Sequence, residues 1–216
     1  ANHNGKNLIF KYPSYGPDTC VGVGESIEQA GLSRPAMAEI ASLVYTAVIA
    51  KKEELEFKEV RDMMKIRWLC GFTGNKYIPK KGVYIQDDLE IIDGMIFMNE
   101  SDLLEKLEAE DPRVRFVPFG FNIGEMAFRE LERNPYLIGL AGEEGASKLA
   151  EVSAKPGNKR PYLWGFKSID KPLTSVAALH SNFYRADRLD IDGNYHSFSE
   201  GFSFGVIGVE HVQKGY

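Results

Sequence analysis

The 216-residue sequence predicts a single domain of the α+β class. In the first third, apolar residues recur at three- and four-residue spacing, which is typical of helices packed on a core. The remainder holds short alternating runs rich in aromatic and β-branched residues, separated by Gly and Pro, which are typical of strands. The hydrophobic content of 44% and charged content of 26% are ordinary globular values, and no repeat or long linker divides the chain.

Within the first third, we expect a strand over residues 6–12, followed by a short helix that Ser26 caps and Gly31 ends. Ser33 is the expected cap of a longer helix, whose apolar stripe faces the core. A further helix is expected over 53–64, with charged residues on its outer face.

The later elements are shorter. We expect a hairpin over 67–78 and 83–86 with Trp68 in the core, a strand over 91–98, a helix over 101–110, a strand over 113–119, a helix from 122 that ends before 134, a segment 137–141 that fits helix or strand, a helix over 143–154, and strands over 161–166, 175–179 and 201–209. The last two are expected to be adjacent and antiparallel.

Charge and cysteine content exclude several classes of function. A net charge of −5 argues against nucleic acid or an anionic membrane as partner. The longest apolar run, 36–50, is too short to insert across a bilayer, and the polar start of the chain predicts no cleavable signal. Cys20 and Cys70 form no metal framework, and free buried thiols are favoured over one disulfide. We expect no cofactor.

One motif is typical of a catalytic serine. Residues 201–205 match G-x-S-x-G, but the nucleophile elbow requires a strand, a turn and a helix, with an acid and a His later in the chain. The alternation instead predicts that Ser203 points away from the side of Phe202 and Phe204. We therefore assign no catalytic residue.

A second motif is similar to a calcium loop. Asp190, Asp192 and Gly193 have its spacing, but its first position is Arg188, which is not a ligand. A calcium site of another type, using Asp187, Asp190 or Asp192, stays open. We assign no metal.

The segment 180–204 has an unusual composition. It lacks Lys, Gln, Met and Trp and contains a single Glu, Glu200. Aromatic and short polar residues between two strands are typical of a binding loop, and an ordinary surface loop is the alternative. The expected ligand contacts are His180, Asn182, Phe183, Tyr184, Arg185, Asp187, Asp190, Asp192, Asn194, Tyr195, His196, Phe198, Ser199 and Phe202. Those within 182–187 and 194–198 are expected to be largely exposed.

The C-terminal layout resembles that of the variable proteins of diversity-generating retroelements, particularly those of archaea and archaeal viruses. The resemblance rests on Tyr162, Leu163 and Trp164, the run 176–179, the segment from His180, and the closing run 201–206. Residues 31–35 and the following helix also resemble the helix start of the formylglycine-generating-enzyme type of C-type lectin fold. In that motif Thr and Trp stand where this chain has Ala36 and Ile40.

The resemblance implies a C-type lectin fold over residues 1–216, with helices packed beside small antiparallel sheets, strand 6–12 near the C-terminal strand, and a variable ligand-binding region at 180–204. The stretch 87–155 is long for a minimal lectin fold, so an insert there is an open alternative. In that family a reverse transcriptase mutates template adenines, mostly in AAY codons. The resulting NNY codons cannot encode Glu, Lys, Gln, Met or Trp, which matches the composition of 180–204 if Glu200 is not diversified.

The implied function is non-enzymatic display of a hypervariable region, which binds a protein or cell-surface ligand through 180–204. The resemblance leaves a virion or a cell surface open as location. A structural or interaction domain with an ordinary C-terminal loop is one alternative. An enzyme on a related fold is another, but its oxygen-activating chemistry requires two cysteines near the C-terminus, and Cys20 and Cys70 lie far from it.

Overall fold

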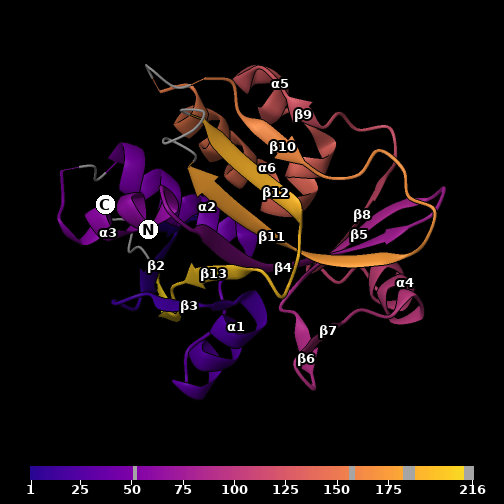
Figure 1. Ribbon diagram of the computed structural model, residues 1–216, viewed down its shortest axis with the longest axis horizontal. Helices are drawn as coiled ribbons and strands as arrows, with labels where there is room; N and C mark the ends of the chain where they lie inside the picture. Colours follow the sequence, from indigo (N-terminus) through magenta and orange to yellow (C-terminus); the bar gives the residue numbers. More distant parts are fainter. Residues whose placement is uncertain (51–52, 156–158, 182–187, 212–216) are drawn as a thin grey trace.

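The computed structural model describes residues 1–50, 53–155, 159–181 and 188–211, with side chains through residue 208. Helices flank a central sheet (Figure 1). The elements are β1 (Asn2–His3), β2 (Lys6–Phe10), β3 (Tyr15–Thr19), α1 (Cys20–Gln29), α2 (Met37–Tyr45) with a π-helical turn η1 (Thr46–Ala50), α3 (Glu56–Met64), β4 (Trp68–Ile78), β5 (Gly82–Asp87), β6 (Glu90–Ile92), β7 (Met95–Phe97), α4 (Glu100–Glu108), β8 (Val114–Pro118), β9 (Gly124–Glu125), α5 (Phe128–Glu132), α6 (Pro135–Ser153), β10 (Tyr162–Trp164), β11 (Leu173–Ser181), β12 (Leu189–Tyr195), β13 (Glu200–Ser203) and β14 (Val206–His211).

The central sheet is mixed. Among the described residues it contains nine strands, in the order β3-β13-β4-β11-β12-β10-β9, with β5 on β4 and β8 on β5. Strand β11 is antiparallel to β4 and β12, whereas the β10–β12 and β13–β4 pairs are parallel. In a separate small sheet, β14 pairs antiparallel with β2. The expected proximity of the first strand to the C-terminal strand is therefore confirmed.

The expected adjacency of 175–179 and 201–209 is wrong, because β4 lies between β11 and β13. The second run also divides at residues 204–205: β13 stays in the central sheet, while β14 joins β2. Alternating apolar residues predict that a strand forms, but they carry no information about which strands lie beside it.

Apolar side chains cover the two faces of the sheet separately. On the inner face, α2, α3 and α6 pack against β4, β11, β12 and β13 through residues such as Leu69, Leu179 and Ile191. On the opposite face, α1 and α4 contribute to a second apolar cluster that also contains Cys70 and Val176. Strand β8 and helices α5 and α6 contribute to the inner core, so part of the stretch 87–155 is built into it.

Several helices begin at other caps than expected. The side chain of Thr19, not of Ser26, accepts from the Gly22 N–H at 3.0 Å and starts α1. Helix α2 begins after Ala36 rather than at Ser33, with the Glu39 carboxylate accepting from the Ala36 N–H at 2.8 Å. The helix expected from residue 122 starts only at α5, and the ambiguous segment 137–141 belongs to α6.

The expectation of free thiols is wrong, because Cys20 and Cys70 form a disulfide. The first turn of α1 lies against β4, which places the two Cα atoms 6.0 Å apart, and both residues are buried. Strand β13 passes directly over this bond. A Cβ at Gly201 would lie 2.5 Å from the Cys70 Sγ, so the close approach requires glycine.

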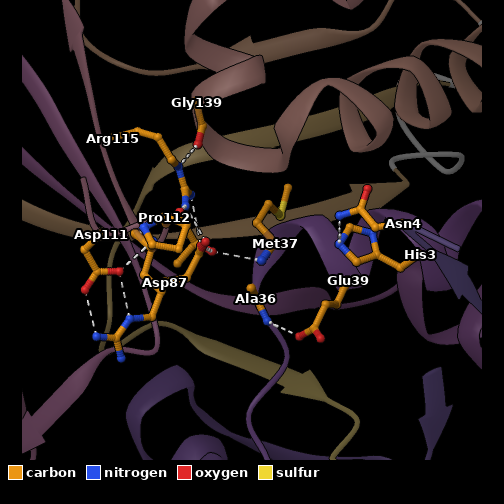
Figure 2. Close-up of polar contacts among 12 residues, drawn as sticks. His3, Asn4, Ala36, Met37, Glu39, Asp87, Asp111, Pro112, Arg115 and Gly139 are labelled. Carbon is orange, nitrogen blue, oxygen red and sulfur yellow. Dashed lines mark hydrogen bonds and ion pairs between the residues drawn. The ribbon is translucent and has the colours of Figure 1, made fainter. Parts of the chain in front are cut away.

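A chain of polar contacts joins the helices to the sheet on the side of β5 and β8. Figure 2 shows Arg115 between Asp87 and the carbonyl of Gly139, to which its Nε donates at 2.9 Å. Asp87 also accepts from the Thr73 hydroxyl at 2.6 Å, and that hydroxyl accepts from the Met37 N–H at 2.9 Å. These contacts fix α2 and α6 relative to β4, β5 and β8. No helix within the described ranges is both long and apolar enough to cross a membrane.

Candidate functional site

The segment 180–204 belongs largely to the central sheet. It supplies the end of β11, all of β12, and β13 (Figure 1). Five predicted ligand contacts, Asn182, Phe183, Tyr184, Arg185 and Asp187, lie outside the described residues. Their exposure therefore stays a prediction, and the site is built below from the strands on either side of them.

Strand register brings polar and aromatic side chains together on the face opposite the inner core. Along β12, Leu189 and Ile191 point into the inner core, so Asp190 and Asp192 point the other way. Asp190 is the register partner of His180 on β11 and of Tyr162 on β10, and Asp192 is the partner of Ala178 and Trp164. We call this surface the outer face: Trp68, Tyr162, Trp164, His180, Arg188, Asp190, Asp192 and Tyr195.

Asp190 is buried in a charged and aromatic setting. The Arg188 Nε donates to its Oδ1 at 2.8 Å. The same guanidinium lies over the Tyr162 ring, 4.6 Å from its centroid. A guanidinium that faces both a carboxylate and an aromatic ring combines an ion pair with a cation–π contact. The Asp190 carboxylate, which was expected to contact a ligand, thus already pairs with Arg188 of the same protein.

Asp192 differs because it forms no ion pair with any described residue. It is 9% exposed, and its Oδ1 accepts from the Asn194 N–H at 2.7 Å. Burial raises its pKa to about 7, and the neighbouring Asp190 charge acts in the same direction. Its register partner Trp164 is 38% exposed. The Asp192 carboxylate is therefore mostly charged only above about pH 7, and no described cationic side chain pairs with it there.

At the opposite edge of the outer face, three rings pack together in tilted arrangements. The Trp68 ring lies 5.0 Å from both the His180 and the Tyr195 ring. Burial lowers the pKa of His180, so the neutral imidazole is favoured there. Tyr195 is only 7% exposed and donates to the Glu200 carbonyl at 2.7 Å, so the expectation that it is exposed is wrong. Its ring packs against Trp68 and belongs to the apolar cluster on this face of the sheet.

The turn after β12 is open to solvent. Phe198 is 55% exposed, and its ring centroid lies 5.5 Å from that of the exposed His196. Asn194 and Ser199 are half-buried, and the Ser199 N–H donates to the His196 carbonyl at 2.9 Å. The expectation of exposed side chains is confirmed for His196 and Phe198.

Strand β13 turns its aromatic residue inward. Phe202 is fully buried in the inner core beside Phe204, so its expected contact with a ligand is wrong. The alternation of β13 places Ser203 on the other side, where its hydroxyl is buried and donates to the Cys70 carbonyl at 2.8 Å. Ser203 is thus a structural hydrogen-bond donor, and the direction that alternation predicts for its side chain is confirmed.

Buried hydrogen bonds hold β12 firmly beneath the outer face. The Gly193 carbonyl accepts from the Tyr77 hydroxyl at 3.0 Å and from the Ser175 hydroxyl at 2.8 Å. A Cβ on Gly193 would lie 1.9 Å from the Tyr136 hydroxyl oxygen, so this contact also requires glycine. The strand that carries Asp190 and Asp192 is thereby fixed from the core side.

Two cavities lie away from the outer face, one of them at the inner side of segment 180–204. An apolar cavity of about 240 Å³ lies at the inner side of the β11 and β12 ends, lined by Val48, Met64 and Leu189 among others. A polar cavity of about 500 Å³ lies beside His3, Asp87 and Arg115, remote from residues 180–204 in sequence and strand order. Within the described ranges, no group of three or more His, Cys, Asp or Glu residues is arranged to hold a metal ion.

Trp68, Tyr162 and Trp164 were not among the residues expected at the site. Tyr162 and Trp164 flank Leu163, which is buried in the inner core, so alternation predicts that both rings share the opposite face. Nothing local in the sequence indicates that this face continues that of Asp190 and Asp192, because the parallel pairing of β10 and β12 joins distant segments.

No protein-family model and no curated protein matches the sequence. The fold is similar to that of a solved structure from Nanoarchaeota, described as the accommodation of massive sequence variation in Nanoarchaeota by the C-type lectin fold. The two chains are 16% identical, and the match has a TM-score of 0.61 over 95% of this chain and 100% of the other. The chain has a C-type lectin fold of the α+β class, and this prediction is confirmed.

Proposed function

We propose that this protein is a non-enzymatic binding protein whose segment 180–204 is diversified by a retroelement and displayed to varied protein targets. The observation that carries the proposal is that the segment separates buried core residues from residues exposed to solvent. Residues such as Leu189, Ile191 and Phe202 fill the inner core, while His196 and Phe198 face solvent. Side chains at the exposed positions can change without altering the core that holds them.

Rigidity of the surrounding strands supports the same conclusion. Gly193 and Gly201 fix β12 and β13 against Tyr136 and the Cys20–Cys70 disulfide. A binding face that is held in place before the ligand arrives loses less conformational entropy on binding. Exposed aromatic residues at such a face supply large contact areas, as they do in other binding loops.

Two further observations agree with diversification. The segment 180–204 contains no Lys, Gln, Met or Trp and one Glu, Glu200, whose carboxylate pairs with Arg67. The solved Nanoarchaeota structure accommodates massive sequence variation on a C-type lectin fold. A display protein of this kind needs no catalytic residue or cofactor, and its partner is a protein or cell-surface ligand.

The proposal is tested with two libraries, one within segment 180–204 and one outside it. In the first, residues 182–187, 194, 196 and 198 are randomised. In the second, the exposed apolar side chains of the β6–β7 hairpin, Ile92, Met95 and Phe97, are randomised. Both libraries are panned against the same set of cell-surface proteins, and folding of the unselected variants is measured by thermal unfolding.

We expect the first library to yield folded binders with distinct targets and the second to yield none above background. Sequencing the DNA beside the gene should also reveal a reverse transcriptase and a near-identical template repeat. If the binders all depend on positions outside 180–204, or if randomising the first set unfolds the protein, the display function is refuted.

A further inference from the structure

The outer face repeats one arrangement at two successive register positions. At the first, Tyr162 on β10 and Asp190 on β12 are partners, and Arg188 lies between carboxylate and ring. At the second, Trp164 and Asp192 are partners in the same way. The ring centroids of Tyr162 and Trp164 lie 4.2 Å apart, so the aromatic surface is continuous between the two positions.

The two positions differ in whether a described cationic side chain pairs with the carboxylate. Arg188 supplies a guanidinium to Asp190, whereas no described Lys, Arg or His pairs with Asp192. One Asp192 oxygen accepts a backbone N–H from Asn194, which satisfies part of its hydrogen-bonding capacity but does not neutralise its charge. Trp164 is 38% exposed, so an incoming group can reach this ring from the solvent side, whereas Asp192 beside it is 9% exposed.

We propose that Asp192 and Trp164 together bind a cationic group of the ligand, a guanidinium or a primary ammonium. This inference rests on the proposed binding function and names the chemistry that the outer face recognises. A cation placed there neutralises the buried carboxylate and lies against the electron-rich face of the indole. The Arg188 contact with Asp190 and Tyr162 shows the same recognition within the chain.

Small probes test this site directly. Nα-acetylarginine amide and Nα-acetyl-lysine amide are titrated into ¹⁵N-labelled protein at pH 8, and Nα-acetylcitrulline amide serves as the neutral control. The readout is the indole N–H signal of Trp164, with Trp68 as the internal reference. Asp192→Asn removes the charge at nearly constant shape, and Asp93→Asn, at the exposed tip of the β6–β7 hairpin, is the matched control.

We expect both cationic probes to shift the Trp164 signal and citrulline amide to leave it unchanged. Asp192→Asn should weaken the arginine probe at least fivefold, and Asp93→Asn should leave it as in the parent. If Asp192→Asn does not fold, the exposed Trp164→Leu variant is used with the Asn194 backbone N–H as reporter, and it should weaken the probe similarly. An equal response to citrulline amide, or undiminished binding in either site variant, overturns the inference.

The two proposals fail in different ways. If panned binders depend on 180–204 but cationic probes do not reach Trp164, the cation site is wrong and the display function stands. If the probes bind at Trp164 but no binder uses 180–204, the display function is wrong and the cation site stands.

Discussion

Removal of the Cys20–Cys70 disulfide should destabilise the protein by an amount set mainly by the denatured chain. The two cysteines are 50 residues apart in sequence. Closing a loop of that length removes about 14 cal/mol/K of entropy from the denatured state, which corresponds to about 4 kcal/mol at 25 °C. For a chain of this size, that loss lowers Tm by roughly 10 °C.

The measurement is urea unfolding of Cys20→Ala, Cys70→Ala and the double variant, followed by far-ultraviolet circular dichroism. Each single substitution already abolishes the bond, so each should cost about 4 kcal/mol, and the double variant should cost nearly the same. Wild type refolded under reducing conditions should match them. A double variant that loses the sum of the two single effects, or any loss below about 1 kcal/mol, would refute the loop-closure reasoning.

Three other predictions concern the site and the core beneath it. Gly193→Ala, whose new Cβ meets a tyrosine hydroxyl, should destabilise by about 2 kcal/mol or more, whereas Gly208→Ala, with open space around it, should change the unfolding free energy by less than about 0.5 kcal/mol. Asp192 has a folded-state pKa of about 7, above its unfolded value, so the free energy of unfolding should fall as pH rises from about 4 to 7. Asp192→Asn should remove that fall, as measured by urea unfolding at pH 5 and pH 8. In the same assay, Phe202→Ala should lower the free energy of unfolding by about 3–5 kcal/mol, and Phe198→Ala by less than about 0.5 kcal/mol. Equal losses would contradict the placement of Phe202 in the core and of Phe198 in solvent.

Much of the local structure follows from the sequence. The β4–β5 hairpin was predicted within two residues of its observed bounds, because aromatic and β-branched residues alternate on both sides of a Gly-containing turn. The pairing of β2 with β14 was expected only from the resemblance to lectin folds. For the candidate site, composition singled out segment 180–204, and alternation gave the direction of Ser203.

The sequence did not separate buried from exposed aromatic residues within that segment. Tyr195, Phe198 and Phe202 are all aromatic residues among small polar ones, yet Tyr195 packs on Trp68, Phe202 fills the inner core, and Phe198 is exposed. Burial of each ring depends on which residues from distant segments lie over it. Residue type alone therefore overestimates the number of exposed aromatic side chains.

By itself, the sequence determined the α+β class, most strands and the segment that we propose binds a ligand, since apolar periodicity and composition are properties of neighbouring residues. Only the tertiary structure decided that β4 separates β11 from β13, that Cys20 meets Cys70, and that Trp164 stands beside Asp192. Each of these depends on pairing between segments far apart in the chain. Such pairing is selected by the packing of the whole core, and no local pattern encodes it.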